Sequence, residues 1–140
     1  MVQRSAEAEW RGGLQDGAGT MKLGSGAFEG AYSYTSRFAQ GTGTNPEELI
    51  GAAHAGCLTM ALSLILGEAK LTAERMETTA EVTLEKVADG FAITAVHLIL
   101  KAKVPGADQA KLEALAGKAK AGCPVSKLLN AEITLDATLL

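Results

Sequence analysis

The sequence predicts an α+β domain with a largely antiparallel sheet, built in the order β-β-β-α-β-β-α-α-β. Two observations predict this class. Runs that alternate between apolar and polar residues, the period of half-buried strands, occur near the start, in the middle and at the end of the chain. Between them lie a long uncharged run from Leu49 to Gly67 and two shorter segments with helical spacing. Because 140 residues is near the usual size of one domain, we expect a single domain over residues 1–140.

The first forty residues are predicted to form an antiparallel meander. Apolar and polar residues alternate at about 6–11, 21–23 and 32–38, and glycine-rich turns separate these runs. In the third predicted strand the aromatic side chains face one way, whereas Arg37 falls on the polar side.

The central uncharged run is predicted to be a helix that begins after Asn45 and reaches Ala69. Asn45 is a favourable N-cap, Pro46 suits the first helical position, and Glu48 stands where a capping box requires it. The run approaches membrane-spanning length, but it contains polar residues and has no basic flank, so we expect no membrane partner. A helix that is apolar on nearly all sides must be buried all round, so we expect a second subunit to cover it in a homodimer.

The second half of the chain is predicted to add two strands, two helices and a final strand. Strands at 79–85 and 91–100 are joined by an Asp-Gly turn, and a helix follows from about 108 to 120. A proline then starts a short helix with Cys123 at its N-cap, and residues 132–139 alternate again.

The composition argues against several functions. A formal net charge of −3 with mixed signs gives no basic stripe for nucleic acid. Cysteines and histidines do not occur at zinc-site spacing and no glycine-rich phosphate loop follows a strand, so we expect neither a zinc site nor a phosphate-binding loop. The first ten residues contain acidic side chains and no apolar segment typical of an export signal, so the expected location is the cytoplasm.

The two widely spaced cysteines are the most informative residues, because in a cytoplasmic protein they fit a catalytic thiol pair better than a structural disulfide. Cys57 can also be read as a small core residue, although Ala53 and Gly56 leave room beside its sulfur. Cys123, at a helix N-cap, would meet free backbone N–H groups that favour a thiolate. His54, one helical turn before Cys57, could touch that sulfur, but a neutral histidine hydrogen-bonded in the core is the simpler reading.

A reactive Cys57 needs a cation, and none is near it in the sequence. Arg37 is the candidate, with Glu47 to hold its guanidinium; their ordinary readings are a solvated arginine and a first-turn carboxylate. On a straight helix Glu47 lies about 15 Å from Cys57 along the axis, so these groups meet only if the helix breaks or if two subunits contribute. Together the cysteines suggest a peroxide mechanism, in which Cys57 becomes a sulfenic acid and Cys123 condenses with it to a disulfide.

Two motifs occur together in this chain: TNPEELIGAAHAGC and, later, KAKAGCPVSKLLNAEITL, with SYTSRF before them and DGFAIT between them. With these motifs the chain resembles, over nearly its whole length, the OsmC branch of the OsmC/Ohr organic hydroperoxide reductases. The resemblance implies an OsmC-like fold, an intertwined homodimer whose antiparallel sheets wrap around two long central helices. It also implies two active sites at the subunit interface.

The same resemblance implies a role for each candidate residue. Cys57 matches the peroxidatic cysteine and Cys123 the resolving cysteine. Glu47 matches the glutamate that orients the catalytic arginine. Arg37 matches that arginine as the OsmC branch places it, and Arg11 is the alternative, because the Ohr branch draws its arginine from an earlier turn.

The implied substrates are alkyl and fatty-acid-like hydroperoxides, held in an apolar pocket lined by residues such as Leu49, Ile50 and Met60. The implied reductant is a dithiol such as a lipoylated protein, with no metal or flavin. Two other readings stay open: a non-catalytic stress protein that senses oxidation or binds an apolar ligand, and a structural dimer with inert core cysteines. Whether Arg37 and Glu47 serve the thiol of their own chain or that of the partner also stays open.

Overall fold

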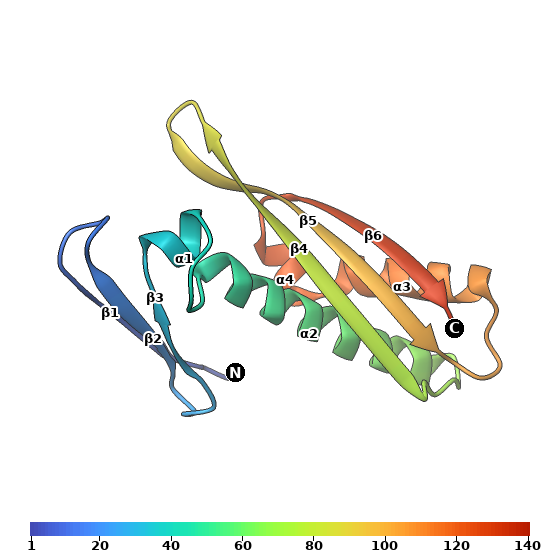
Figure 1. Ribbon diagram of the computed structural model, residues 1–140. Helices are drawn as coiled ribbons and strands as arrows, with labels where there is room; N and C mark the ends of the chain where they lie inside the picture. The colour runs from blue at the N-terminus through green and yellow to red at the C-terminus, as the bar shows by residue number, and fades with distance from the viewer. The chain divides into compact units, whose positions relative to one another are not determined.

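A computed structural model describes residues 1–140, which divide into two compact units, Met1–Leu49 and Ile50–Leu140 (Figure 1). Helix α2, Pro46–Glu68, begins in the first unit and continues without a break into the second. The expectation of one domain over residues 1–140 stays a prediction.

The first unit contains the predicted antiparallel meander. Its strands pair in the order β1-β2-β3, and a short helix, α1, follows them. The bounds of these elements are Ala6–Arg11 for β1, Ala18–Leu23 for β2, Glu29–Tyr32 for β3 and Tyr34–Phe38 for α1.

The predicted third strand, at about residues 32–38, is misplaced, and this part of the prediction is wrong. Strand β3 ends at Tyr32, and Tyr34–Phe38 is helical. The reason is a reciprocal capping box: the N–H of Ser36 donates to Oγ of Ser33 at 3.1 Å, and the N–H of Ser33 donates to Oγ of Ser36 at 2.9 Å. Arg37 therefore lies on a helix and not on the polar face of a strand.

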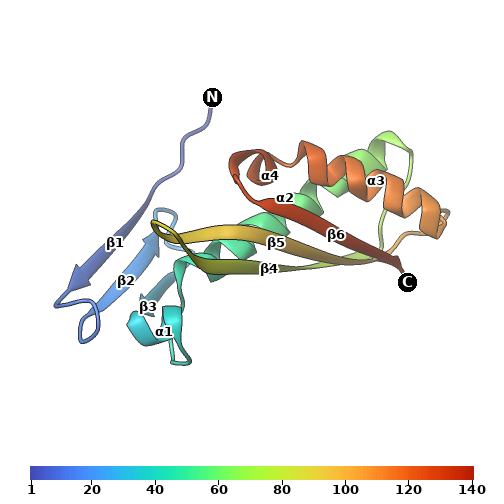
Figure 2. The same ribbon diagram turned by 90° about the horizontal axis from the view of Figure 1, so that it is seen from above.

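The second unit contains a three-stranded sheet in the order β4-β5-β6, with helices of the same unit on one face (Figure 2). Strands β4, Arg75–Val87, and β5, Gly90–Lys103, are antiparallel. Helices α3, Gln109–Gly122, and α4, Pro124–Leu128, then return the chain, so that β6, Glu132–Leu139, lies parallel to β5. A crossover of this length is what a parallel pair requires.

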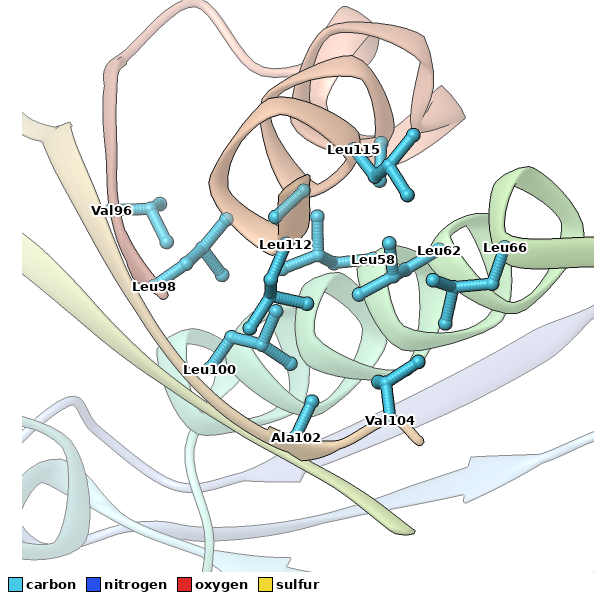
Figure 3. Close-up of a cluster of buried hydrophobic side chains, with 12 residues drawn as sticks. Leu58, Leu62, Leu66, Val96, Leu98, Leu100, Ala102, Val104, Leu112 and Leu115 are labelled. Carbon is cyan, nitrogen blue, oxygen red and sulfur yellow. The ribbon is translucent and has the colours of Figure 1, made fainter. Parts of the chain in front are cut away.

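The hydrophobic core of this unit lies between α2, β5 and α3. Figure 3 shows leucine and valine side chains from these three elements pointing toward one another. The largest fully buried members are Leu58, Leu62 and Leu66 of α2, Val96, Leu98 and Leu100 of β5, and Leu112 of α3.

Hydrogen bonds between residues close in the sequence start and end helix α2. Oδ1 of Asn45 accepts the N–H of Glu48 at 2.7 Å, which confirms the predicted cap. The helix ends at Glu68, one residue before the predicted end. There the N–H of Leu71 donates to the carbonyl of Leu66 at 2.8 Å, and Lys70 has a φ of 59°, as in a Schellman motif whose usual residue is glycine.

Only one face of α2 is covered. The opposite face is exposed and apolar, and it includes Met60 at 78% and Leu64 at 66% exposure. By length and hydropathy alone this helix could cross a membrane, a test that core helices of soluble proteins also pass. The exposed face agrees with the expectation that something outside this chain covers the helix.

Candidate active site

The fold of the second unit brings the two cysteines together. Sγ of Cys57 and Sγ of Cys123 lie 2.7 Å apart, although 66 residues separate them in the chain. Both are free thiols; Cys123 is fully buried and Cys57 is partly exposed. A disulfide needs the sulfurs at about 2.05 Å, so these thiols can be joined with little movement of the backbone.

Each cysteine is placed by a helix. Cys57 lies in the middle of α2, beside Gly56, where an added Cβ would meet no atom within 4 Å. Cys123 lies between α3 and α4, as the C-cap of one and the N-cap of the other, and Pro124 starts the second helix as predicted. The Cys123 side chain makes no standard capping hydrogen bond.

The two thiols differ in acidity within this unit. Burial raises the pKa of Cys57, and the hydrogen bond shared with Cys123 raises it further. Burial also acts to raise the pKa of Cys123, but Cys57 and the N–H and hydroxyl groups of Ser126, together with the N–H of Val125, lower it on balance. A thiolate at Cys57 therefore needs a positive charge beyond these groups, which is the role predicted for Arg37.

His54 is buried beside this cysteine pair. Its side chain is fully buried, and Nε2 lies 2.8 Å from Oγ of Ser126 on α4. Burial lowers the pKa of His54, so the neutral ring is favoured at neutral pH. The predicted reading of a hydrogen-bonded core histidine is confirmed, whereas nothing in the sequence pattern marked Ser126.

Arg37 and Glu47 form the predicted pair in the first unit. Nη2 of Arg37 lies 2.8 Å from Oε1 of Glu47, and Nε of Arg37 lies 3.2 Å from Oε1 and 3.3 Å from Oε2. The Glu47 side chain is 10% exposed and the Arg37 side chain 37%. The carboxylate is thus fixed and nearly buried, while the guanidinium keeps an open side.

The open side of Arg37 belongs to an aromatic cavity of about 250 Å³. The cavity is formed within the first unit by Trp10, Leu14, Tyr32, Ser33, Tyr34, Arg37 and Phe38. The Phe38 ring lies 5.2 Å from the guanidinium carbon, within the range of a cation–π contact. Sequence reasoning missed this cavity, although the aromatic side chains of the predicted meander were a signal for it.

The residues predicted to line the substrate pocket, and the alternative arginine, do not lie together in one site. Leu49 and Ile50 are half-buried, one in each unit. Met60 lines an apolar hollow of about 470 Å³ in the second unit, together with Gly56, which neighbours Cys57. Arg11, the alternative arginine, lies on β1 and pairs with Glu9, and both side chains are exposed.

The chain was compared with known protein families and proteins. The family model described as OsmC-like protein matches residues 39–138. Peroxiredoxin OsmC of Escherichia coli is 50% identical over 139 residues, which cover 99% of this chain and 97% of that protein. The organic hydroperoxide resistance protein of Xanthomonas axonopodis pv. citri is 33% identical over 102 residues, which cover 72% of this chain and 70% of that protein.

Solved structures agree with these relatives. The organic hydroperoxide resistance protein OhrB of Bacillus subtilis superposes with a TM-score of 0.75 at 28% identity, covering 96% of this chain and 98% of that one. An organic hydroperoxide resistance protein from Elizabethkingia anophelis gives a TM-score of 0.75 at 26% identity and 99% coverage of both chains. The mixed α+β fold is therefore that of OsmC and Ohr proteins.

Proposed function

The chain belongs to the OsmC-like protein family, and we propose that it is a thiol peroxidase that reduces organic hydroperoxides to alcohols. The observation that carries the proposal is the 2.7 Å separation of a partly exposed and a fully buried free thiol. Such a pair gives a peroxide one accessible nucleophile and one protected partner. The names of the relatives, peroxiredoxin OsmC and organic hydroperoxide resistance protein, support a peroxidase-type role.

In the proposed first step the Cys57 thiolate attacks the distal oxygen of the hydroperoxide. The S–O bond forms while the O–O bond breaks, and the alkoxide leaves and takes up a proton to become the alcohol. In the second step Cys123 attacks the sulfenic sulfur, an S–S bond forms and water leaves. A dithiol, such as that of a lipoylated protein, then reduces the disulfide by exchange.

Arg37 is proposed to supply the positive charge that both Cys57 and the peroxide oxygens need, with Glu47 holding the guanidinium. Because α2 is one unbroken helix, ten residues between Glu47 and Cys57 span about 15 Å along its axis. We therefore propose that the pair acts on the Cys57 thiol of a second copy. The exposed apolar face of α2 supports a homodimer of this kind.

The organic part of the substrate is proposed to lie against apolar and aromatic side chains. The cavity beside Arg37 is aromatic, and the hollow at Met60 has Gly56, the neighbour of Cys57, in its wall. Both surfaces favour alkyl or aryl hydroperoxides over hydrogen peroxide. We expect the enzyme to work as a soluble protein in the cytoplasm.

The test is a thiol count on reduced protein before and after one equivalent of cumene hydroperoxide, with Cys57→Ser and Cys123→Ser as matched variants. The proposal expects the wild type to lose two thiols, Cys57→Ser to lose none, and Cys123→Ser to stop at a trappable sulfenic acid. If all three proteins keep their thiols, the cysteines are core residues and the proposal is wrong.

A further inference from the structure

Strand β6 is an outer strand of its sheet, so one of its edges has no strand beside it in this chain. Such an edge presents backbone N–H and C=O groups with which another chain can pair. The odd-numbered residues of β6 point these groups away from β5, because the carbonyls of Ile133 and Ala137 and the N–H of Leu139 all bond to side chains of α3. The next residue, Leu140, donates its N–H to the carbonyl of Ala102 on β5 at 2.8 Å, which agrees with this alternation.

The side chain of Gln109 occupies the place on this edge that a residue of a further strand would take. Its Nε2 donates to the carbonyl of Ala137 at 2.7 Å, and its Oε1 accepts the N–H of Leu139 at 2.7 Å. A residue of a parallel neighbouring strand makes the same pair of bonds, one donated and one accepted. Gln109 also donates to Oε1 of Glu113, one helical turn along α3, at 2.8 Å, so its amide is fixed against the strand.

Lys120 covers a second point on the same edge. Its Nζ donates to the carbonyl of Ile133 at 3.1 Å, and an incoming strand would have to displace or bury this charge. Between the two covered points, Leu135 and Ala137 line a hollow of about 620 Å³ whose other wall includes Gly117 of α3. The covered carbonyls of Ile133 and Ala137 are roughly 13 Å apart along the strand, which is shorter than a typical strand.

We propose that Gln109 and Lys120 close the β6 edge to a second copy of this chain. Strand β4 is the other outer strand of this sheet and has 13 residues with no strand beside them in this chain, so β4 of a second copy is the partner that an open β6 edge would fit. A contact between two different edges does not close on itself and would continue from copy to copy. The two side chains therefore confine assembly to other surfaces, and this role does not depend on the proposed peroxidase chemistry.

The test replaces both side chains, Gln109→Ala and Lys120→Ala together, and follows sedimentation velocity of the reduced protein over a range of concentrations. Alanine favours the helix, and neither side chain is fully buried, so α3 should stay folded. We expect the double variant to form species larger than wild type that grow with time and concentration. Lys118→Ala removes an exposed lysine from the same helix and should sediment as wild type. A double variant that sediments as wild type at every concentration overturns the proposal.

A third substitution, Ala137→Pro, tests whether the larger species form through β6. The N–H of Ala137 points away from β5, so proline removes an outward donor and leaves the hydrogen bonds between β5 and β6 in place. We expect the triple variant, checked for native circular dichroism, to return to the sedimentation of wild type. Larger species that persist in a folded triple variant would place the contact elsewhere and overturn the proposal.

Hydrogen exchange examines the same edge without the proline. In wild type the N–H of Leu139 is bonded to Gln109, so Gln109→Ala at low concentration should speed its exchange about fivefold. In the assembled double variant the N–H groups of Leu135 and Ala137 should exchange more slowly than in wild type, because a strand of a second copy pairs with them. Unchanged exchange at Leu139 would refute the role of Gln109. Leu135 and Ala137 amides that exchange as fast in the larger species as in wild type would refute pairing through β6.

Discussion

The Arg37–Glu47 pair makes a quantitative prediction about stability. Three contacts of 2.8 to 3.3 Å join the two side chains, one nearly buried and the other about one third exposed. Exposed ion pairs couple by at most about 1 kcal/mol, whereas close charge pairs with little access to solvent couple by about 1.5–7 kcal/mol in double-mutant cycles. A half-screened pair should lie between these limits, so we expect a coupling free energy of about 2 kcal/mol.

The assay is a double-mutant cycle with Glu47→Gln, Arg37→Met and the double variant, each unfolded in urea. Glu47 also lies in the first turn of α2, where its charge favours the helix dipole by about 0.3–1 kcal/mol. That contribution is present in both arginine backgrounds and cancels in the cycle. A coupling below about 0.5 kcal/mol would refute the idea that Glu47 fixes the guanidinium.

Four further predictions follow from other parts of the molecule. Leu62→Ala, in the fully buried core, should lower the free energy of unfolding by about 3 kcal/mol in urea titrations, and a loss below about 1 kcal/mol would contradict the packing in the second unit. Lys70→Gly should raise it by about 0.5 kcal/mol, because glycine adopts a φ of 59° without strain; a destabilised variant would contradict this. Because burial lowers the pKa of His54, the unfolded chain binds its proton more readily below about pH 6.5, so the free energy of unfolding should decrease as the pH falls below that value. His54→Gln should weaken this pH dependence in urea titrations at several pH values, and an unchanged dependence would contradict the burial of His54. Leu64→Glu places a charge on the exposed apolar face of α2 and should convert the proposed dimer to monomers in sedimentation velocity, whereas an unchanged oligomer would place the interface elsewhere.

Local signals explain which elements the sequence predicted. The start of α2 depends on Asn45 and Pro46, and the capping hydrogen bond spans only three residues, so the sequence was sufficient. The prediction of the third strand was wrong for an equally local reason. Alternation continued through residues 32–38, but the Ser33–Ser36 capping box outweighed it and formed a helix.

The arrangement of the candidate site comes from contacts between residues that are far apart in the sequence, so no local pattern could predict it. The two cysteines were recognised from their motifs, but their 2.7 Å separation follows from how α2 and the α3–α4 junction pack. The contact between His54 and Ser126 gave no sequence signal, because the two residues lie 72 positions apart in the chain. The parallel pairing of β6 with β5 likewise depends on the path of the chain through α3 and α4.

The most direct test of the central claim is turnover. Reduced protein is given an excess of dihydrolipoamide and repeated equivalents of cumene hydroperoxide, and the cumyl alcohol formed per chain is measured, with Cys57→Ser as the control. A peroxidase that cycles through Cys57 and Cys123 should form many equivalents of alcohol per chain, and the control none. Alcohol that stops at one equivalent per chain would contradict catalysis and identify the cysteine pair as a single-use sensor of oxidation.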